Sequence, residues 1–383
     1  MTPATDGEQS QDPAEGSTGG GESTGDPLDD TAALPPQVGE HYAFVNARLP
    51  GGESIVLEVD GGLVVSVSSE PPADLAVIDL EGKTVVPGFI DSHVHLAFQY
   101  GVDDVGQGAQ RLMSGGVVGA VDLAAPLEAL AGFDGEQWLA AGPMITAELG
   151  YPTQGWGANG YGMEVSGPQA ATDAVNMIAD LGAKLIKVPV DQGPALSDDE
   201  LLAIVTRAHE RGLLVAAHAL GDVEAARAAA VGADILAHTP VEPLSDATIE
   251  AWRGRAVIST LRAFGSRETS IENLRQLHAA DATVLYGTDL GNLRIEGIDA
   301  GELLLLAQAG LTPPQIIASG TSAAASLWGM PGLGALEPGK AATLLVLAGD
   351  PLEDPTWLAE PVAVYVDGEL MPPPANTPGG FGP

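Results

Sequence analysis

The chain has 383 residues, of which 45% are hydrophobic, and a formal net charge of −37. Such a negative surface repels phosphate backbones and anionic lipid, so we expect no nucleic-acid partner. The sequence has no cysteine, which excludes disulfides and thiolate metal sites and leaves histidine and carboxylate as ligands for an ion such as zinc. No apolar run reaches the roughly 18 residues that a membrane-spanning helix needs.

Both ends of the chain have the composition of unstructured segments. Residues 1–38 consist mainly of Gly, Ser, Thr, Pro and acidic residues, without Lys or Arg, and we predict a disordered acidic tether there. Residues 373–383, rich in Pro and Gly, are predicted to be a flexible tail. An acidic tether is found in exported, surface-tethered bacterial proteins and also as the tail of cytoplasmic ones, so the compartment stays open.

A small β domain is predicted from two separate parts of the chain, residues 39–82 and 335–372. Short alternating runs, YAFVNARL, SIVLEVD, LVVSVSS and AVIDL, are separated by GG and PP turn signals. The same pattern returns in ATLLVLAGD and VAVYVDGEL. We therefore expect a β-sandwich that both ends of the chain build together.

Residues 83–334 alternate apolar β runs with helical stretches. The eight runs are TVVPGFI, VVGAVDL, PMITA, KLIKVPV, LLVAAH, DILAH, AVIST and TVLYGTD. Amphipathic stretches such as SDDELLAIVTRAHERG lie between them and begin with Ser or Asp caps. This order predicts an α/β fold with a (β/α)8 TIM-like barrel. A doubly wound open sheet is the alternative, but its glycine fingerprint for a dinucleotide is missing after the first run.

Histidines stand at the ends of several predicted barrel strands. His93 and His95 follow the first strand, His218 ends the fifth and His238 ends the sixth, while Asp289 ends the eighth. Catalytic groups of such barrels come from the carboxyl ends of different strands. Because residues i and i+2 of a strand project to the same face, the two histidines of His-Val-His can bind one ion. A buried core histidine is the alternative for each position alone, and the set as a whole favours metal.

The same segments carry a family resemblance. PGFIDSHVHL, VAAHALG, ILAHT and YGTD resemble the metal-dependent amidohydrolase superfamily. GAKLIKV, followed by SDDELLAIVTRAHERGLLVAAHA, looks like the branch that contains imidazolonepropionase-like proteins and zinc-dependent Xaa-Pro or Xaa-Arg dipeptidases. GLGALEPGKAATLLVLAGDPLED is similar to the segment by which these proteins return to their β domain, so the resemblance spans about residues 40–370.

The resemblance implies a site for two divalent ions, zinc or alternatively Mn, Co or Fe. It implies that His93, His95 and Asp289 hold one ion and that His218 and His238 hold the second. Lys187 would bridge them after carboxylation by CO2, a step that needs an uncharged amine, and burial lowers a lysine pKa in that direction. Lys184 competes for this role, but it has the opposite strand parity and lies nearer the amino end of its strand.

The reaction implied is attack by metal-activated hydroxide on a carbonyl, with Asp289 passing the proton to the leaving group. Superfamily deaminases typically carry Glu three residues after the fifth-strand histidine, where this chain has Gly221. We therefore expect hydrolysis of an amide or peptide C–N bond rather than deamination. A mononuclear cyclic-amide hydrolase, a hydrolase of lactones, carbamates or phosphotriesters, and a metal-containing surface binding protein without turnover remain open.

The expected partner is a small molecule, an N-acyl amino acid, a dipeptide or a related amide, and the expected assembly is a homo-oligomer. The loop ELGYPTQGWGANGYG lacks the histidine of the Gly-Gly-His loop that such dipeptidases often show. Tyr151, Trp156 and Tyr161 in this loop are candidates for an aromatic substrate wall, or else loop anchors. Arg262, in STLRAFG, is a candidate clamp for a substrate carboxylate, with a salt bridge to an acidic residue as the alternative.

Overall fold

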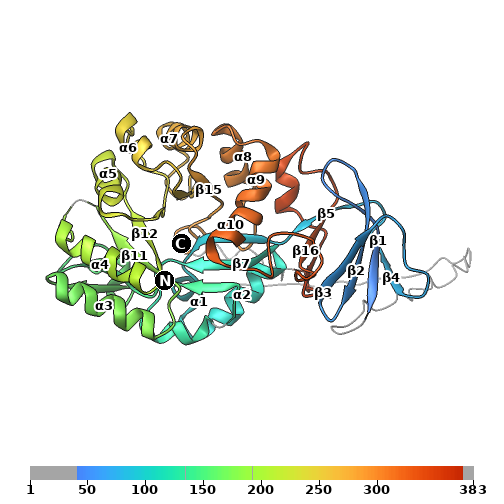
Figure 1. Ribbon diagram of the computed structural model, residues 1–383, viewed down its shortest axis with the longest axis horizontal. Helices are drawn as coiled ribbons and strands as arrows, with labels where there is room; N and C mark the ends of the chain where they lie inside the picture. Colours follow the sequence, from blue (N-terminus) through green and yellow to red (C-terminus); the bar gives the residue numbers. More distant parts are fainter. Residues whose placement is uncertain (1–40, 134, 192, 374–383) are drawn as a thin grey trace, which may run out of the picture. The chain divides into compact units, whose positions relative to one another are not determined.

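The computed structural model describes residues 41–133, 135–191 and 193–373 (Figure 1). The predicted tether, residues 1–38, and nearly all of the predicted tail lie outside these residues. No helix in the part of the chain that the structure describes is long and apolar enough to cross a membrane.

Both ends of the described chain contribute to one mixed sheet. Its strands are β1 (Tyr42–Arg48), β2 (Ser54–Asp60), β3 (Leu63–Ser68), β4 (Ala76–Asp79), β5 (Thr84–Pro87), β16 (Leu344–Leu347), β17 (Ala363–Val366) and β18 (Glu369–Leu370). Their order is β18-β17-β16-β5-β1-β2-β3, and β4 pairs with β1. The antiparallel pairing of β5 with β16 joins the early and late parts of the chain, as the two-part domain prediction expects.

The sheet rolls over a core of its own. β1 and β17 are separated in the sheet by β16 and β5. In a flat sheet they would lie about 14 Å apart, because neighbouring strands are about 4.8 Å apart. The ring centroids of Phe44 and Tyr365 are nevertheless 4.7 Å apart. The two halves of the sheet therefore face each other across a shared apolar core, as in the sandwich that the sequence predicts.

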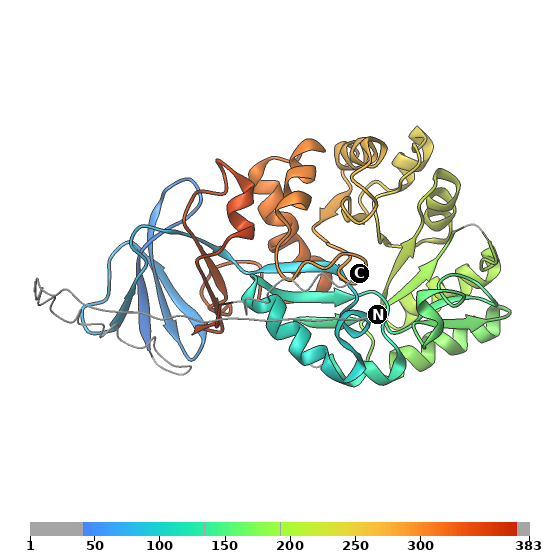
Figure 2. The same cartoon turned by 180° about the vertical axis from the view of Figure 1, so that it is seen from behind.

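The second part of the fold alternates parallel strands with helices. The strands are β6 (Phe89–Val94), β7 (Val117–Asp122), β8 (Trp138–Ala140), β9 (Met144–Ala147), β10 (Gly162–Val165), β11 (Leu185–Pro189), β12 (Leu214–His218), β13 (Ile235–Leu236), β14 (Ala256–Ile258) and β15 (Thr283–Leu285). The helices are α1 (Leu96–Tyr100), α2 (Val105–Ser114), α3 (Pro168–Asp180), α4 (Asp198–Glu210), α5 (Asp222–Val231), α6 (Asp246–Ala251), α7 (Glu268–Ala279), α8 (Ala300–Gln308), α9 (Pro313–Ser319) and α10 (Ser322–Trp328). Figures 1 and 2 show the helices on the outside of these strands.

Backbone hydrogen bonds connect these strands in a closed circuit. Parallel ladders run from β6 to β8 and from β11 to β15. The Lys184 amide donates to the Ala140 carbonyl at 3.0 Å, which links the two ladders. At the other junction the Asp289 amide donates to the His93 carbonyl at 2.8 Å. This strand order is the one expected of the predicted barrel.

Two of the predicted barrel runs have other limits in the structure, and one of them is divided. In TVVPGFI, Thr84–Pro87 belong to the small sheet and only Phe89 onward to the barrel, so the expected barrel start at residue 83 is too early. Gly88 allows this crossing, since a Cβ there would lie 2.5 Å from Val118. PMITA likewise continues an unpredicted strand, β8, because Gly142, with a φ of 69°, and Pro143 interrupt the third strand.

The predicted Ser cap is present at α4, whereas the N-cap of α5 is Gly221, without a side-chain hydrogen bond. Ser197 accepts a hydrogen bond from the Glu200 amide, and Glu200 accepts from the Ser197 amide, which forms a capping box at the start of α4. The predicted helical stretch SDDELLAIVTRAHERG corresponds to α4, and α5 follows β12. These helices pack apolar faces on the strands and so hold the strand ends in register.

Gly320 provides a test of how tightly the helices pack on β6. Its carbonyl accepts from the Ile90 amide at 2.6 Å, and a Cβ at this position would overlap the ring of the fully buried Phe89. We expect Gly320→Ala to lower the free energy of unfolding by about 1–3 kcal/mol, measured by urea unfolding.

Gly332→Ala is the matched control, because a Cβ there would meet no atom within 4 Å. We expect it to change stability by no more than about 0.5 kcal/mol. Equal unfolding midpoints for the two variants would contradict the packing described here.

Candidate active site

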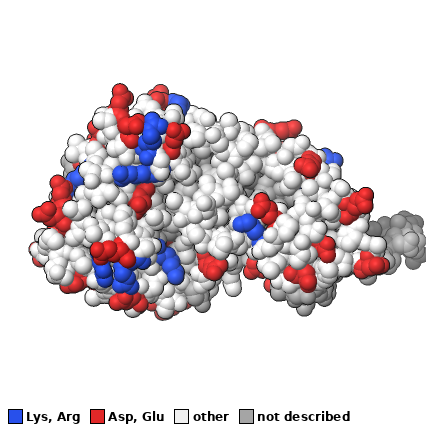
Figure 3. Space-filling view, in the orientation of Figure 1, with Lys and Arg blue, Asp and Glu red and all other residues white. Residues whose placement is uncertain are grey.

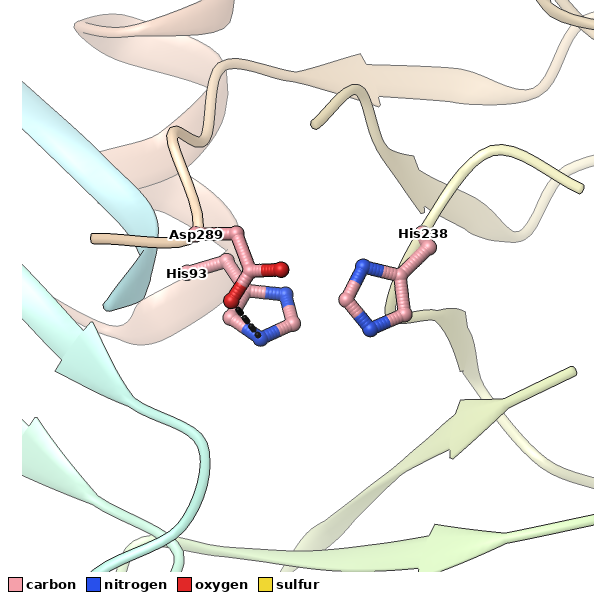
Figure 4. Close-up of side chains that lie close together, drawn as sticks. All are labelled: His93, His238 and Asp289. Atoms are coloured by element: carbon pink, nitrogen blue, oxygen red, sulfur yellow. Dashed lines mark ion pairs between the residues drawn. The ribbon is translucent and has the colours of Figure 1, made fainter. Parts of the chain in front are cut away.

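Three buried side chains from different strands meet at one end of the barrel (Figure 4). His93 lies on β6, His238 follows β13 and Asp289 follows β15. One ligand atom of each lies within 4.8 Å of those of the other two. Two imidazole nitrogens and a carboxylate at this spacing are a donor set suited to zinc or a similar divalent ion.

The rings of His93 and His238 are each fixed through one nitrogen. His93 Nδ1 donates to the Ala237 carbonyl at 2.7 Å, and His238 Nδ1 is hydrogen-bonded to the Thr260 hydroxyl at 3.1 Å. Burial holds the pKa of both rings well below the ordinary value. Both histidines are therefore neutral at physiological pH, which is the form that binds metal, with Nε2 left for a ligand role.

Asp289 is held as an ionised carboxylate. Its backbone lies in the left-handed region, with a φ of 57°, and its carboxylate oxygens each accept from the Asn292 side-chain amide at 3.0 Å. Burial raises its pKa, but His93 and His95 outweigh burial and lower it to about 2. An anionic oxygen therefore faces the histidines across the physiological range.

His95 lies between two carboxylates. Its Nε2 is 3.2 Å from Asp289 Oδ1, and its Nδ1 is 3.8 Å from Asp122 Oδ1. Burial lowers its pKa, but the two carboxylates outweigh burial and raise the pKa above the ordinary value, to about 9. Asp122 thus orients the ring on the side away from Asp289.

Lys187 lies on β11 with no exposed surface. Its Nζ has no hydrogen-bond partner among the residues described. Burial lowers its pKa to about 7, against the opposing effect of Asp289, Asp191 and Asp122. The competing Lys184 is exposed. A substantial fraction of Lys187 therefore carries an uncharged amine near neutral pH.

His218 ends β12 and is oriented by a carboxylate. Its Nε2 is 2.7 Å from Asp191 Oδ2. Within the described chain its buried Nδ1 has no partner. The ring is thus held through one nitrogen while the other stays available as a ligand.

A buried carboxylate joins the strands that carry these ligands. Asp91 on β6 accepts hydrogen bonds from the amides of His93 and Thr288 at 3.0 Å and from the Thr288 hydroxyl at 2.5 Å. Burial raises its pKa to about 7, although the donated hydrogen bonds lower it. Asp91 therefore fixes β6 against the segment that leads to Asp289.

The unpartnered nitrogens show that these residues fit metal ions. Four buried nitrogen atoms here have no partner within residues 41–133, 135–191 and 193–373: His93 Nε2, His95 Nδ1, Lys187 Nζ and His218 Nδ1. Leaving such groups buried and unsatisfied is unfavourable. Coordination to metal, or carboxylation in the case of the lysine, would satisfy them.

A cavity of about 390 Å³ opens beside this cluster. Its polar lining residues are His95, Asp191, His218, His238, Asp289 and Asn292. Its apolar lining residues are Met144, Tyr151, Trp156, Leu220, Ala263 and Phe264. A volume of this size suits a small-molecule substrate.

Two of the three aromatic residues predicted to form a substrate wall line the cavity, and the third does not. Tyr151 stacks on His218 with centroids 5.0 Å apart, and Trp156 lies 5.2 Å from the His95 ring. Both line the cavity. Tyr161 instead packs behind Trp156, at 5.7 Å, and does not belong to the lining.

Arg262 is not brought into the cavity. Its guanidinium donates to Asp299 Oδ1 at 2.6 Å, and its amide donates to Glu302 at 2.8 Å. This is the salt bridge that the sequence left as the alternative to a carboxylate clamp. The carboxylate of Asp299, which is buried, satisfies the guanidinium outside the cavity.

Among the residues of this site that sequence reasoning missed are Asp122, Asp191, Asn292 and Phe264. Asp122 and Asp191 stand at the ends of β7 and β11, where the histidines were recognised, so the same strand-end rule could have found them. Asn292 and Phe264 lie in loops. Phe264 packs on His238 with centroids 4.7 Å apart, a contact for which the sequence carries no signal.

The chain matches the amidohydrolase family over residues 84–371. It is 28% identical over 341 residues to the imidazolonepropionase of Streptomyces griseus, which covers 77% of this chain and 85% of that protein. A putative prolidase from Bifidobacterium longum has a TM-score of 0.74 at 26% identity, covering 87% of this chain and 95% of its own. A Xaa-Pro dipeptidase with bound methionine shares the fold, with a TM-score of 0.74 at 22% identity, covering 86% and 99%.

These comparisons confirm the resemblance that the sequence motifs carry. The matched residues include the strand-end histidines, Lys187 and Asp289. The described fold, a mixed α/β unit with a sheet from both ends of the chain, resembles amidohydrolase structures, a TIM barrel with a β-sandwich domain. The chain therefore belongs to the amidohydrolase family and is a hydrolase that acts on carbon–nitrogen bonds.

Proposed function

We propose that the protein hydrolyses an amide-type C–N bond of a small molecule with two divalent ions, zinc in the first instance, bridged by carboxylated Lys187. The first ion would be held by His93, His95 and Asp289, and the second by His218 and His238. The observation that carries this proposal is a set of buried nitrogen atoms without partners in the described chain: His93 Nε2 on β6, Lys187 Nζ on β11 and His218 Nδ1 on β12.

Lys187 is the residue that distinguishes a two-ion site. An amine attacks CO2 only in its neutral form, and the lowered pKa of about 7 provides that form. The reaction joins Nζ to the CO2 carbon and releases one proton, so an uncharged amine becomes an anion with two oxygens. That anion would satisfy a side chain which is buried and has no partner among the residues the structure describes.

The bound ions would supply activation of a water molecule and polarisation of the substrate carbonyl. Asp289 would accept the proton of the attacking water and deliver it to the leaving nitrogen. Its ionised state, with a pKa of about 2, keeps it ready to accept, and Asn292 keeps its oxygens directed into the site.

Tyr151 supports substrate binding at the cavity wall. Its hydroxyl accepts from Trp156 Nε1 at 3.0 Å, and burial raises its pKa to about 12. The phenol therefore stays protonated, and its own hydrogen is available for the carbonyl oxygen of a substrate.

A second candidate is a mononuclear hydrolase of cyclic amides, in which Lys187 stays uncarboxylated. It is favoured by the compact group of His93, His238 and Asp289 within 4.8 Å. The similarity to imidazolonepropionase points to cyclic amides, and that to a putative prolidase points to dipeptides and N-acyl amino acids.

Metal content separates the two candidates. Protein prepared without chelator and with bicarbonate should hold about two ions per chain, and Lys187→Ala should reduce this to about one. Elemental analysis of the purified protein measures this.

Lys184→Ala is the matched control, because Lys184 is an exposed lysine next to the same strand, and it should keep the wild-type content. A content of one ion per chain that does not change in Lys187→Ala would contradict the two-ion site and favour the mononuclear candidate.

Metal loading should increase with pH through the pKa of Lys187. Below about 7 the amine is protonated and cannot react with CO2, whereas above it the neutral form dominates. We expect the bicarbonate-dependent part of metal uptake to be larger at about pH 8 than at about pH 6. Uptake that bicarbonate does not affect at either pH would argue against the carbamate.

Asp289→Asn tests proton transfer. We expect the rate of amide hydrolysis, followed by amine release, to fall by at least about 10²-fold, since the amide cannot accept the proton. Asp281→Asn is the control: Asp281 is an exposed aspartate with a similar left-handed φ of 66°, paired with Arg253 on the surface. Full activity of Asp289→Asn at unchanged metal content would refute this role.

A further inference from the structure

The cavity beside the metal-binding cluster has no basic side chain in its wall. The chain has fifteen Lys and Arg residues, all within the described ranges, and none of them lines the cavity. Two carboxylates, Asp191 and Asp289, do line it. A free carboxylate on a bound molecule would therefore find no Lys or Arg to pair with, and the charge of His95 is already matched by Asp289 and Asp122.

Two arginines close in sequence to the lining, Arg262 and Arg267, are engaged by other groups. Arg262 pairs with Asp299, and Arg267 Nε donates to the Phe264 carbonyl at 3.2 Å. Arg294, two residues after Asn292, is exposed. On the face shown in Figure 3, basic side chains lie mostly beside acidic ones.

The apolar part of the wall consists of flat aromatic faces around the candidate ligands. Tyr151 covers His218, Trp156 approaches His95 and Phe264 packs on His238. The ring centroid of Phe264 also lies 6.4 Å from that of His218, so Phe264 borders both His218 and His238. Aromatic side chains in such a wall favour offset or edge contacts with another planar ring.

We infer that the cavity binds the substrate through an uncharged aromatic group next to the scissile amide, and that it discriminates against a free carboxylate on that group. This inference rests on the amide hydrolysis proposed above. It excludes, as preferred substrates, dipeptides and N-acyl amino acids whose carboxylate would enter this cavity. A carboxylate placed there would exchange water for aromatic faces and for Asp191, which is unfavourable without a cation.

The test compares two anilides of the same size. 4-Acetamidoacetophenone and 4-acetamidobenzoate carry the same amide bond and differ in an acetyl group against a carboxylate. With metal-loaded enzyme we expect kcat/KM to be higher for the neutral ketone by about tenfold or more, measured from release of the aromatic amine. A benzoate cleaved as well as the ketone overturns the inference.

Leu220 allows the charge of the wall to be changed. Leu220→Arg introduces a cation into the lining and should reduce the preference for the ketone, mainly by lowering KM for the benzoate. Leu220→Gln, of similar length but uncharged, should keep the preference. An unchanged preference in Leu220→Arg would contradict the electrostatic argument.

Binding to the metal-free protein separates the cavity from catalysis. By calorimetry the ketone should bind more tightly than the benzoate, and Phe264→Ala should weaken ketone binding. If the ketone binds preferentially but neither anilide is cleaved, the inference about the cavity stands and the hydrolysis proposal fails for these amides. If the ketone neither binds nor reacts, the inference is wrong.

Discussion

The hydrogen bonds of Asp91 hold together the seam on which the site depends. This one buried carboxylate binds the amide of His93 on β6 and both the amide and hydroxyl of Thr288, just before Asp289. The first and last strands of the barrel are far apart in sequence, so no local preference sets their register. His93 and Asp289 flank the seam, and His93 Nε2 lies 3.6 Å from Asp289 Oδ1. A shift of one strand against the other would separate these two atoms.

In the described chain, some buried nitrogen atoms of the site have no hydrogen-bond partner. Other nitrogen atoms of the same histidines are held by partners that orient the rings. Ala237, Thr260 and Asp191 each hold one nitrogen of a histidine, and the other nitrogens of His93 and His218 have no partner among the described residues. Such an arrangement is unfavourable in the metal-free protein and becomes favourable when ions bind, so metal binding and stability are coupled. The aromatic wall of the cavity, to which no Lys or Arg of the described chain contributes, would then select among the small molecules that reach the centre.

Much of the fold and the ligand set could be predicted from the sequence. The alternation of apolar runs with capped helices reflects local periodicity, and a strand-ending histidine such as His218 is visible wherever a run can be recognised. What local patterns predicted less well were the breaks within runs. Gly88 divides one predicted strand, and Gly142 separates another from the unpredicted β8, because the chain must cross between sheets or bend there. Both needs arise only from the packing of distant segments.

The sequence by itself determined the family, the strand-end positions of the histidines and Asp289, and the candidate lysine, because these follow from periodicity and motif spacing. The tertiary structure decided which side chains share one cavity. It buried Lys187 and left Lys184 exposed, paired Arg262 with Asp299, and brought Phe264 from a loop onto His238. These outcomes depend on contacts between segments far apart in the chain, whose distances and competing partners are not encoded in any local pattern.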